Sequence, residues 1–243
     1  MDFPKAREAL LERTKKQLQD AVSPDLLIIQ SLASSDELTM QLNHLSKRLR
    51  EWAGYVFPET EHAVSDHERF ARLLAEGEQD EIRLQFCSGT SMGKNLAQPD
   101  WQALKNLATR VADMYTYREE LLNYLETVLK RHNPNVHALL GTTIAARLIS
   151  GAGSRRRLAI LPASTLQLLG AEKALFRHLK SGARSPKHGH IINHQLIQQA
   201  RRNDRGKIAR ALADKAAICA KLDYFEGDFL GDTYLKDLQK RFS

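Results

Sequence analysis

Two long runs of mostly apolar residues recur at alternating steps of three and four, and this spacing constrains the fold more than any other feature. The first run is Leu38, Leu42, Leu45, Leu49, Trp52 and Val56. The second run is Trp101, Leu104, Ala108, Val111, Tyr115, Arg118, Leu122, Leu125 and Leu129, in which Arg118 alone is charged. A 3.5-residue repeat is typical of a coiled-coil seam. Two such helices predict a long antiparallel hairpin with the intervening segment at its tip, and an ordinary helical bundle is the alternative.

Beyond the second run the helical patterns become shorter, because Pro134 and several glycines interrupt them. The sequence predicts helices over 137–150 and over 164–180, the latter capped by Ser164. A last long helix is predicted over 207–224.

The stretch 187–194 is the one candidate for a strand, and it is short. We therefore predict an all-α fold, a long antiparallel coiled-coil hairpin followed by a compact helical domain. The expected segments are 1–24, an N-terminal helical segment, then 25–132, the hairpin with its tip insertion, and then 133–243, the compact domain.

Charge is distributed unevenly along the chain. Residues 1–130 carry 16 Lys and Arg against 21 Asp and Glu, whereas residues 131–243 carry 20 against 8. Nearly all of the positive excess lies between Arg147 and Arg210. This asymmetry indicates that the second half alone meets an anionic partner such as nucleic acid.

A helix over 164–180 would have two distinct faces. The face that we expect to be buried carries Leu168, Ala171, Leu175 and Leu179. The opposite face carries Leu166, Gly170, Lys173, Arg177 and Lys180. Glycine inside a helix costs about 1 kcal/mol relative to alanine. Gly170 on a basic face therefore predicts the close approach of another molecule's backbone, and a packing contact within the same domain is the alternative.

Glu172 stands among these basic residues, at the flank of the apolar face. Its carboxylate needs a hydrogen-bond donor, which is either an arginine of the same chain or the backbone of a partner. A surface ion pair is a further reading and would contribute little to stability.

Other basic side chains flank this helix in the sequence. Before it come Arg155, Arg156 and Arg157. The loop after it holds Arg184, Lys187, His188 and His190. The turn "NDRG" is surrounded by Arg201, Arg202, Arg205, Lys207 and Arg210. Basic residues in loops and at helix starts are well placed to bind phosphates, and the planes of Arg and His stack on unpaired RNA bases.

The sequence predicts no catalytic residue, no metal and no cofactor. The stretch 89–95, "GTSMGKN", lacks the spacing of a phosphate-binding loop. His188, His190 and His194 have no acidic residue or cysteine close by in the sequence to complete a metal site. Paired carboxylates and a Ser-His-Asp order are not evident in the basic half. An RNA nuclease that uses the three histidines is the enzymatic alternative.

The two cysteines, Cys87 and Cys219, give no reason to propose a disulfide, which indicates a reducing compartment. The first 20 residues are charged throughout, and no apolar run approaches the length of a membrane span. We expect an intracellular protein without membrane association.

Several blocks of this sequence resemble the Nop domain family. In the second half they are "LPASTLQLLGAEKALFRHLK", "PKHGHIINH" and "RRNDRGKIARALADKAAICAKLD". The Gly-Ala-Glu-Lys and Ala-Leu-Phe-Arg blocks of that family stand unbroken at 170–173 and 174–177. The blocks "RLREWAGYVFPE" and "NLATRVADMYTYREELLNYLE" resemble the family's coiled-coil hairpin.

The resemblance implies that 133–243 is a Nop domain, which binds ribonucleoprotein (RNP) particles. Its target would be kink-turn RNA together with a ribosomal-type protein already bound to that RNA. Box C/D particles, in which Nop proteins are non-catalytic scaffolds for RNA-guided 2′-O-methylation, and a splicing particle contain such a target. A general basic RNA-binding protein without shape specificity is the alternative.

Carried over residue by residue, the resemblance implies two groups of binding residues. The group facing the protein partner and adjoining RNA is Gly170, Ala171, Glu172 and Lys173. RNA contacts are implied for Arg177, Lys187, His188 and the cluster from Arg201 to Arg210. With the flanking basic residues, the predicted binding set is Gly170, Ala171, Glu172, Lys173, Arg177, Lys180, Arg184, Lys187, His188, His190, Arg201, Arg202, Lys207 and Arg210.

This sequence departs from box C/D Nop proteins at its beginning. Only 24 residues precede "DLLIIQSL", too few for the domain that docks fibrillarin in that family. The expectation is either a short form, similar in layout to the splicing relative, or a truncated chain, and fibrillarin docking is not predicted. The resemblance also implies pairing through the coiled coil, with a second copy or another Nop protein. The expected location is the cytoplasm of an archaeal cell or the nucleus of a eukaryotic one.

Overall fold

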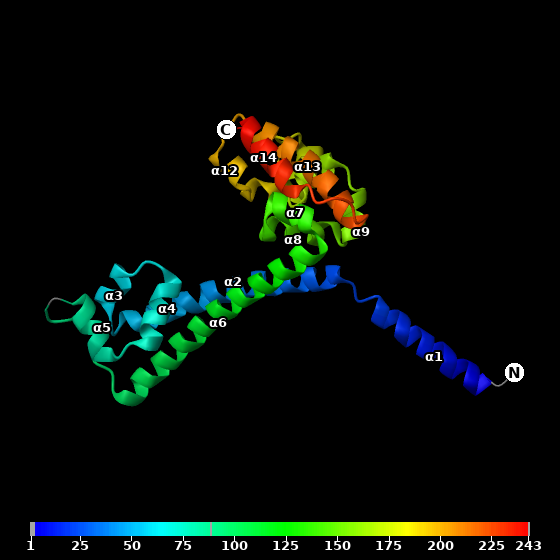
Figure 1. The fold of residues 1–243 in the computed structure, drawn as a ribbon. Helices are drawn as coiled ribbons and strands as arrows, with labels where there is room; N and C mark the ends of the chain where they lie inside the picture. The colour runs from blue at the N-terminus through cyan, green and yellow to red at the C-terminus, as the bar shows by residue number, and fades with distance from the viewer. Residues whose placement is uncertain (1–2, 88, 243) are drawn as a thin grey trace. The chain divides into compact units, whose positions relative to one another are not determined.

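The computed structural model describes residues 3–87 and 89–242, which form two compact units (Figure 1). The hairpin unit comprises residues 33–87 and 89–123, and the main unit comprises residues 3–32 and 124–242. The described residues form fourteen α-helices and one 3-10 helix with no strand among them, so the predicted all-α fold is confirmed.

The division between the units falls within the two longest helices, α2 (Pro24–Gly54) and α6 (Gln98–His132). The domain boundaries predicted at 24/25 and 132/133 stay predictions. Residues 1, 2 and 243 of the predicted end segments, and residue 88 of the predicted tip, lie outside the described residues.

In the hairpin unit, α2 and α6 contribute to one hydrophobic core. The contribution of α2 is Leu42, Leu49, Ala53 and Val56, and that of α6 is Trp101, Leu104, Ala108, Val111 and Tyr115. The hydroxyl groups of Ser46 and Tyr115 lie 3.1 Å apart in this core. The seam predicted on α6 is therefore confirmed within this unit.

The seam predicted on α2 is wrong at Trp52 and only partly correct at Leu45. Ser46 and Ala53 are buried, whereas Leu45 is only partly buried and Trp52 is exposed. The small side chains lie on the line through Leu42 and Leu49 that faces α6. Ser46 lies opposite Tyr115 in this core, and its small side chain leaves room for the phenol ring.

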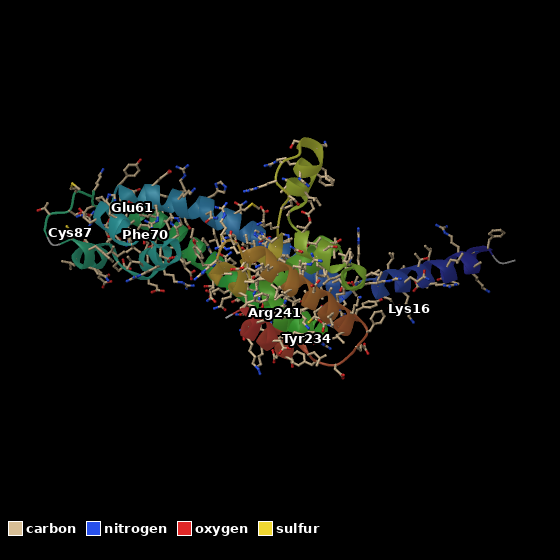
Figure 2. All side chains as sticks on the ribbon, turned by 90° about the horizontal axis from the view of Figure 1, so that it is seen from above. Lys16, Glu61, Phe70, Cys87, Tyr234 and Arg241 are labelled. Atoms are coloured by element: carbon tan, nitrogen blue, oxygen red, sulfur yellow. The ribbon has the colours of Figure 1, made fainter. Side chains whose placement is uncertain are left out.

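Three short helices build the tip of the hairpin unit, namely α3 (Pro58–Ala63), α4 (His67–Glu76) and α5 (Gln79–Phe86). Arg50 of α2 holds two of them, and its side chain is only 11% exposed. Its guanidinium donates to the carbonyls of Glu61, Val64 and Asp66 and to Nδ1 of His67. The same group lies 4.5 Å from the ring centroid of Phe70, which Figure 2 labels beside Glu61.

The main unit is built around α13 (Arg205–Tyr224), whose buried face includes four alanines together with Ile208 and Leu212. Against α13 pack α7 (Pro134–Leu140), α9 (Arg155–Ile160), α10 (Ala163–Leu168), α12 (Gln195–Gln199), α14 (Gly231–Phe242) and the 3-10 helix η1 (His190–Asn193). The remaining helices of this unit are α8 (Thr142–Ala152), α11 (Glu172–Ser181) and α1 (Phe3–Asp20). All residues of α1 are exposed.

Two local expectations for the main unit are corrected. The helix predicted over 137–150 is divided into α7 and α8 at Gly141, whose φ of +78° lies in the left-handed region that favours glycine. The candidate strand at 187–194 contains η1 instead of a strand. None of the helices within the described residues is long and apolar enough to cross a membrane.

Candidate nucleic-acid interface

The segment 164–180, predicted as one helix, is two helices joined by a tight turn. α10 ends at Leu168 and α11 begins at Glu172. The carbonyl of Leu168 accepts a 2.8 Å hydrogen bond from the amide of Ala171. Leu169 has φ −54° and ψ 126°, and Gly170 has φ +89°. These angles define a type II β-turn, which requires a positive φ at its third residue and explains the glycine there.

The turn changes which residues of this segment are buried. Leu166, predicted on the basic face, is fully buried, and Leu169 is buried beside it. Conversely, α11 buries no residue at all, and Phe176 and Leu179 are 61% and 70% exposed. The predicted buried face is thus wrong for α11, because a face computed for one continuous helix does not continue across a turn. Figure 2 shows the yellow-green segment around α11 standing out from the other helices of the main unit.

Two faces of α11 are exposed to solvent. Lys173, Arg177 and Lys180 are all exposed, and helical geometry places them on one side. Phe176 and Leu179 lie next to that side. On their other flank is a groove of about 260 Å³, lined by Ser164, Thr165, Leu168, Leu169, Glu172 and Leu175. α11 therefore presents a basic strip beside an apolar strip.

Glu172 has its hydrogen-bond donor within the chain. Its Oε1 atom accepts a 2.7 Å hydrogen bond from the amide of Gly170. This bond lowers the pKa of the Glu172 carboxyl, and the charge of His190 lowers it further. This donor is a backbone amide of the same chain and not an arginine, and contact between Glu172 and a partner stays a prediction.

The basic loop after α11, residues 182–189, returns to the turn and is fastened there. The amides of Gly189 and His190 donate 2.7 Å hydrogen bonds to the carbonyls of Gln167 and Leu169. The side-chain amide of Gln167 donates to the carbonyl of Lys187 at 2.6 Å. The loop therefore starts at the end of α11 and closes against the turn that precedes α11.

Glycines make this close approach feasible. A Cβ atom on Gly189 would lie 1.8 Å from the carbonyl oxygen of Leu169, and one on Gly170 would lie 2.5 Å from the ring of His190. The packing contact within the domain, one of the two readings of Gly170, is therefore present. The position of Gly170 in a partner interface stays a prediction.

The basic loop and the start of α13 form a positively charged hollow of about 770 Å³. Its lining residues are Arg184, Ser185, Lys187, His188, Arg202, Asn203 and Arg205. The alkyl chain of Lys187 passes close to Gly206, which leaves space for it. Residues nearly 20 positions apart in the sequence therefore meet in one basic surface, and four of them belong to the predicted binding set.

The other predicted basic residues lie around this hollow or on α11. Arg201, Lys207 and Arg210 are exposed near the start of α13, where Lys207 pairs with Asp204 at 3.3 Å. Ser185, Asn203 and Phe176 were missed by the sequence reasoning. Ser185 and Asn203 carry no charge signal, and Phe176 becomes conspicuous only when α11 is considered without α10.

The three histidines considered for a metal site have separate environments. His194 is buried, with Nε2 3.1 Å from the carbonyl of Leu139 and Nδ1 accepting from the amide of Leu196 at the start of α12. His190 packs on Gly170, and His188 lines the basic hollow. Across the described part of the chain, no group of three His, Cys, Asp or Glu side chains could hold a metal ion.

The fold and this surface define a class, namely all-α proteins that consist of a helical hairpin and a compact helical domain with an exposed basic surface. Residues 34–243 match the family described as "Nop: snoRNA binding domain, fibrillarin". This chain belongs to the Nop family.

Two curated relatives and one solved structure show the extent of the similarity. An uncharacterized NOP5 family protein of Methanocaldococcus jannaschii is 42% identical over 247 residues, which cover 95% of this chain and 59% of the relative. Nucleolar protein 58 of Eremothecium gossypii is 40% identical over 220 residues, which cover 84% of this chain and 43% of the relative. The chain therefore spans roughly half the length of these relatives.

The solved structure is that of a fibrillarin/Nop5p complex. It aligns with a TM-score of 0.58 at 23% identity, covering 99% of this chain and 77% of that one. This likeness supports the fold.

Proposed function

We propose that this chain is a non-catalytic RNP scaffold. Its main unit binds a composite surface made of kink-turn RNA and the ribosomal-type protein bound to that RNA, as in box C/D or splicing-related particles. The observation that carries the proposal is the hydrogen bonding of the basic loop to the end of α10 and to the turn that precedes α11. It brings phosphate-binding groups and an exposed apolar strip together on one surface.

The basic hollow is the proposed RNA contact. Phosphate contacts dominate the affinity of proteins for nucleic acids. Arg184, Lys187 and Arg202 converge there from two segments, and His188 and Arg205 add planar groups on which a base can stack. The lysines and arginine of α11 extend this positive surface toward the protein partner.

The apolar strip of α11 is the proposed protein contact. Large apolar side chains exposed together on a monomer mark interaction sites, and Phe176 and Leu179 are both more than half exposed. The groove beside Leu175 provides a place where a partner side chain could be buried. A target that is part RNA and part protein matches a helix that is basic on one side and apolar on the next.

The proposal includes no chemical reaction. Both ring nitrogens of His194 are hydrogen-bonded to backbone groups, and the ring of His190 packs on Gly170. His188, the remaining histidine, lies among cations and has no carboxylate among the residues that line the hollow.

A gel-shift series tests the function. The protein is titrated against a synthetic kink-turn RNA alone, the same RNA bound by its ribosomal-type protein, and a plain duplex of equal length. We expect the RNA–protein complex to bind most tightly. Equal affinity for all three, falling with salt alone, would instead identify a general basic RNA-binding protein.

The hairpin unit is proposed to pair with a second copy or another Nop protein. An RNP particle with this role would lie in the cytoplasm of an archaeal cell or in the nucleus of a eukaryotic cell. Light scattering of the isolated protein measures pairing with a second copy directly, and a monomer at all concentrations would contradict homodimer formation.

A further inference from the structure

The turn from Leu168 to Ala171 joins α11 to α10. α11 buries no residue fully, and only Ala174, Leu175 and His178 are half-buried, so side-chain packing contributes little to fixing its direction. Its N-cap, Ala171, offers no side chain to the free amides at the helix start. The direction of α11 therefore depends on the conformation of the turn from Leu168 to Ala171.

The same turn holds the far end of the basic loop. The carbonyl of Leu169, a central residue of the turn, accepts the amide of His190, and Gln167 just before the turn accepts the amide of Gly189. A change in the turn would move these two acceptors. The loop that carries Arg184, Lys187 and His188 would then lose its place beside α11.

One carboxylate reaches back over this turn. Oε1 of Glu172 accepts the amide of Gly170, the residue whose positive φ makes the turn. Rotation of Gly170 out of the left-handed region would break this hydrogen bond. The carboxylate of Glu172 is thus directed at its own backbone.

We propose that Glu172 is a positioning residue. Its carboxylate locks the Leu168–Ala171 turn, and the turn keeps α11 and the basic loop in the relative arrangement that the RNA–protein target requires. The binding part of this inference rests on the proposed function, whereas the structural part concerns the free protein alone.

Two substitutions separate positioning from direct contact. Glu172→Ala removes the acceptor, whereas Glu172→Gln keeps a carbonyl oxygen at the same place without the charge. Asp232→Ala is a matched control, because Asp232 is an exposed acid in the first turn of α14. Circular dichroism melting checks that each variant is folded.

The first measurement is amide hydrogen exchange in the free protein, followed by NMR. We expect Glu172→Ala to speed exchange at Gly170 about fivefold, the effect of one lost hydrogen bond. Exchange at Gly189 and His190 should also accelerate, although these residues are distant from Glu172 in the sequence. Glu172→Gln and Asp232→Ala should leave all three rates nearly unchanged.

The second measurement is affinity for kink-turn RNA bound by its ribosomal-type protein. Glu172→Ala should weaken binding about fivefold and Glu172→Gln should restore it. Unchanged exchange at Gly189 and His190 in Glu172→Ala would overturn the inference. Equal loss of affinity in the Ala and Gln variants would also overturn it, since that result identifies a charge contact with the partner.

Failure of the proposed function would look different. The wild-type protein would then not prefer the RNA–protein complex, whereas the exchange rates in the free protein would still decide whether Glu172 holds the turn and the loop.

Discussion

The carboxylate of Asp223, near the end of α13, accepts hydrogen bonds from both the backbone and side-chain amides of Asn135 at 2.9 Å, across 88 positions of sequence. It also accepts the amide of Val136. Asn135 in turn accepts the amides of Leu230 and Gly231 through Oδ1. This pair therefore satisfies the free amides at the starts of both α7 and α14.

Asp223→Ala should destabilise the main unit by about 3 kcal/mol, because it leaves buried amides without an acceptor. Urea unfolding followed by circular dichroism measures the loss. Asp237→Ala, at an exposed acid of α14, is the control and should change stability little. A similar small effect in Asp223→Ala would show that water replaces the carboxylate.

Arg50→Met should destabilise the tip of the hairpin unit by about 2–4 kcal/mol, because several carbonyls lose their donor. Both tryptophans, Trp52 and Trp101, belong to this unit, so their fluorescence during urea unfolding reports it. The matched control is Arg48→Met, since Arg48 is an exposed arginine of the same helix that pairs with the exposed Glu51. Equal unfolding midpoints for the two variants would contradict the role assigned to Arg50.

Gly170→Ala should cost about 1–2 kcal/mol of local stability, since alanine disfavours a positive φ. The added methyl group would also displace the ring of His190. Amide exchange at His190 should accelerate accordingly. Gly54→Ala is the counterpart, because a Cβ there meets nothing within 4 Å and Gly54 lies at the end of a helix. Gly170→Ala with the exchange rates of the wild type would argue against the turn.

Lys173→Ala and Arg177→Ala should each weaken binding to the RNA–protein complex and leave the melting temperature nearly unchanged. Both side chains are exposed on a helix that buries nothing. When the logarithm of the binding constant is plotted against the logarithm of the salt concentration, each lost phosphate contact should reduce the magnitude of the slope by about one. Lys236→Ala on α14 is the control, and a large drop in melting temperature for either variant would show that the side chain stabilises the fold.

Acidification should destabilise the main unit below pH 6.5. Burial is the main cause that lowers the pKa of His194, His137 and His132 from the ordinary 6.5. The unfolded chain therefore binds these protons more readily than the folded chain. Stability is full above pH 6.5 and is lost as the pH falls toward the folded values.

Thermal melting at pH 7.5 and pH 5.5 measures this effect. His194→Asn, which keeps an acceptor for the amide of Leu196, should reduce the difference between the two melting temperatures. An unchanged difference would assign the pH dependence to other groups.

The sequence predicted the helical class, the seam of α6 and the long helix α13, because each depends on local periodicity repeated over many turns. It also identified four basic residues that line the hollow, because basic residues are frequent in that part of the sequence and their charge does not depend on the fold. It erred at Trp52, where burial depends on which of two adjacent residues faces the partner helix.

The segment around Gly170 shows where prediction from sequence ends. Its composition favours a helix on both sides, and a glycine inside a helix costs too little to exclude one continuous element. The two-helix arrangement is stabilised by Gly189, His190 and Gln167, and local propensity contains no information on contacts of this kind.

The sequence by itself determined that this chain is helical, that its second half is basic, and that it carries the blocks of the Nop family. Only the tertiary structure decided that Gly170 makes a turn, that Glu172 binds the backbone of that turn, and that α11 is exposed on two faces. The physical reason is that periodicity and charge are properties of neighbouring residues. A turn, by contrast, is fixed by hydrogen bonds from a loop more than 20 positions away.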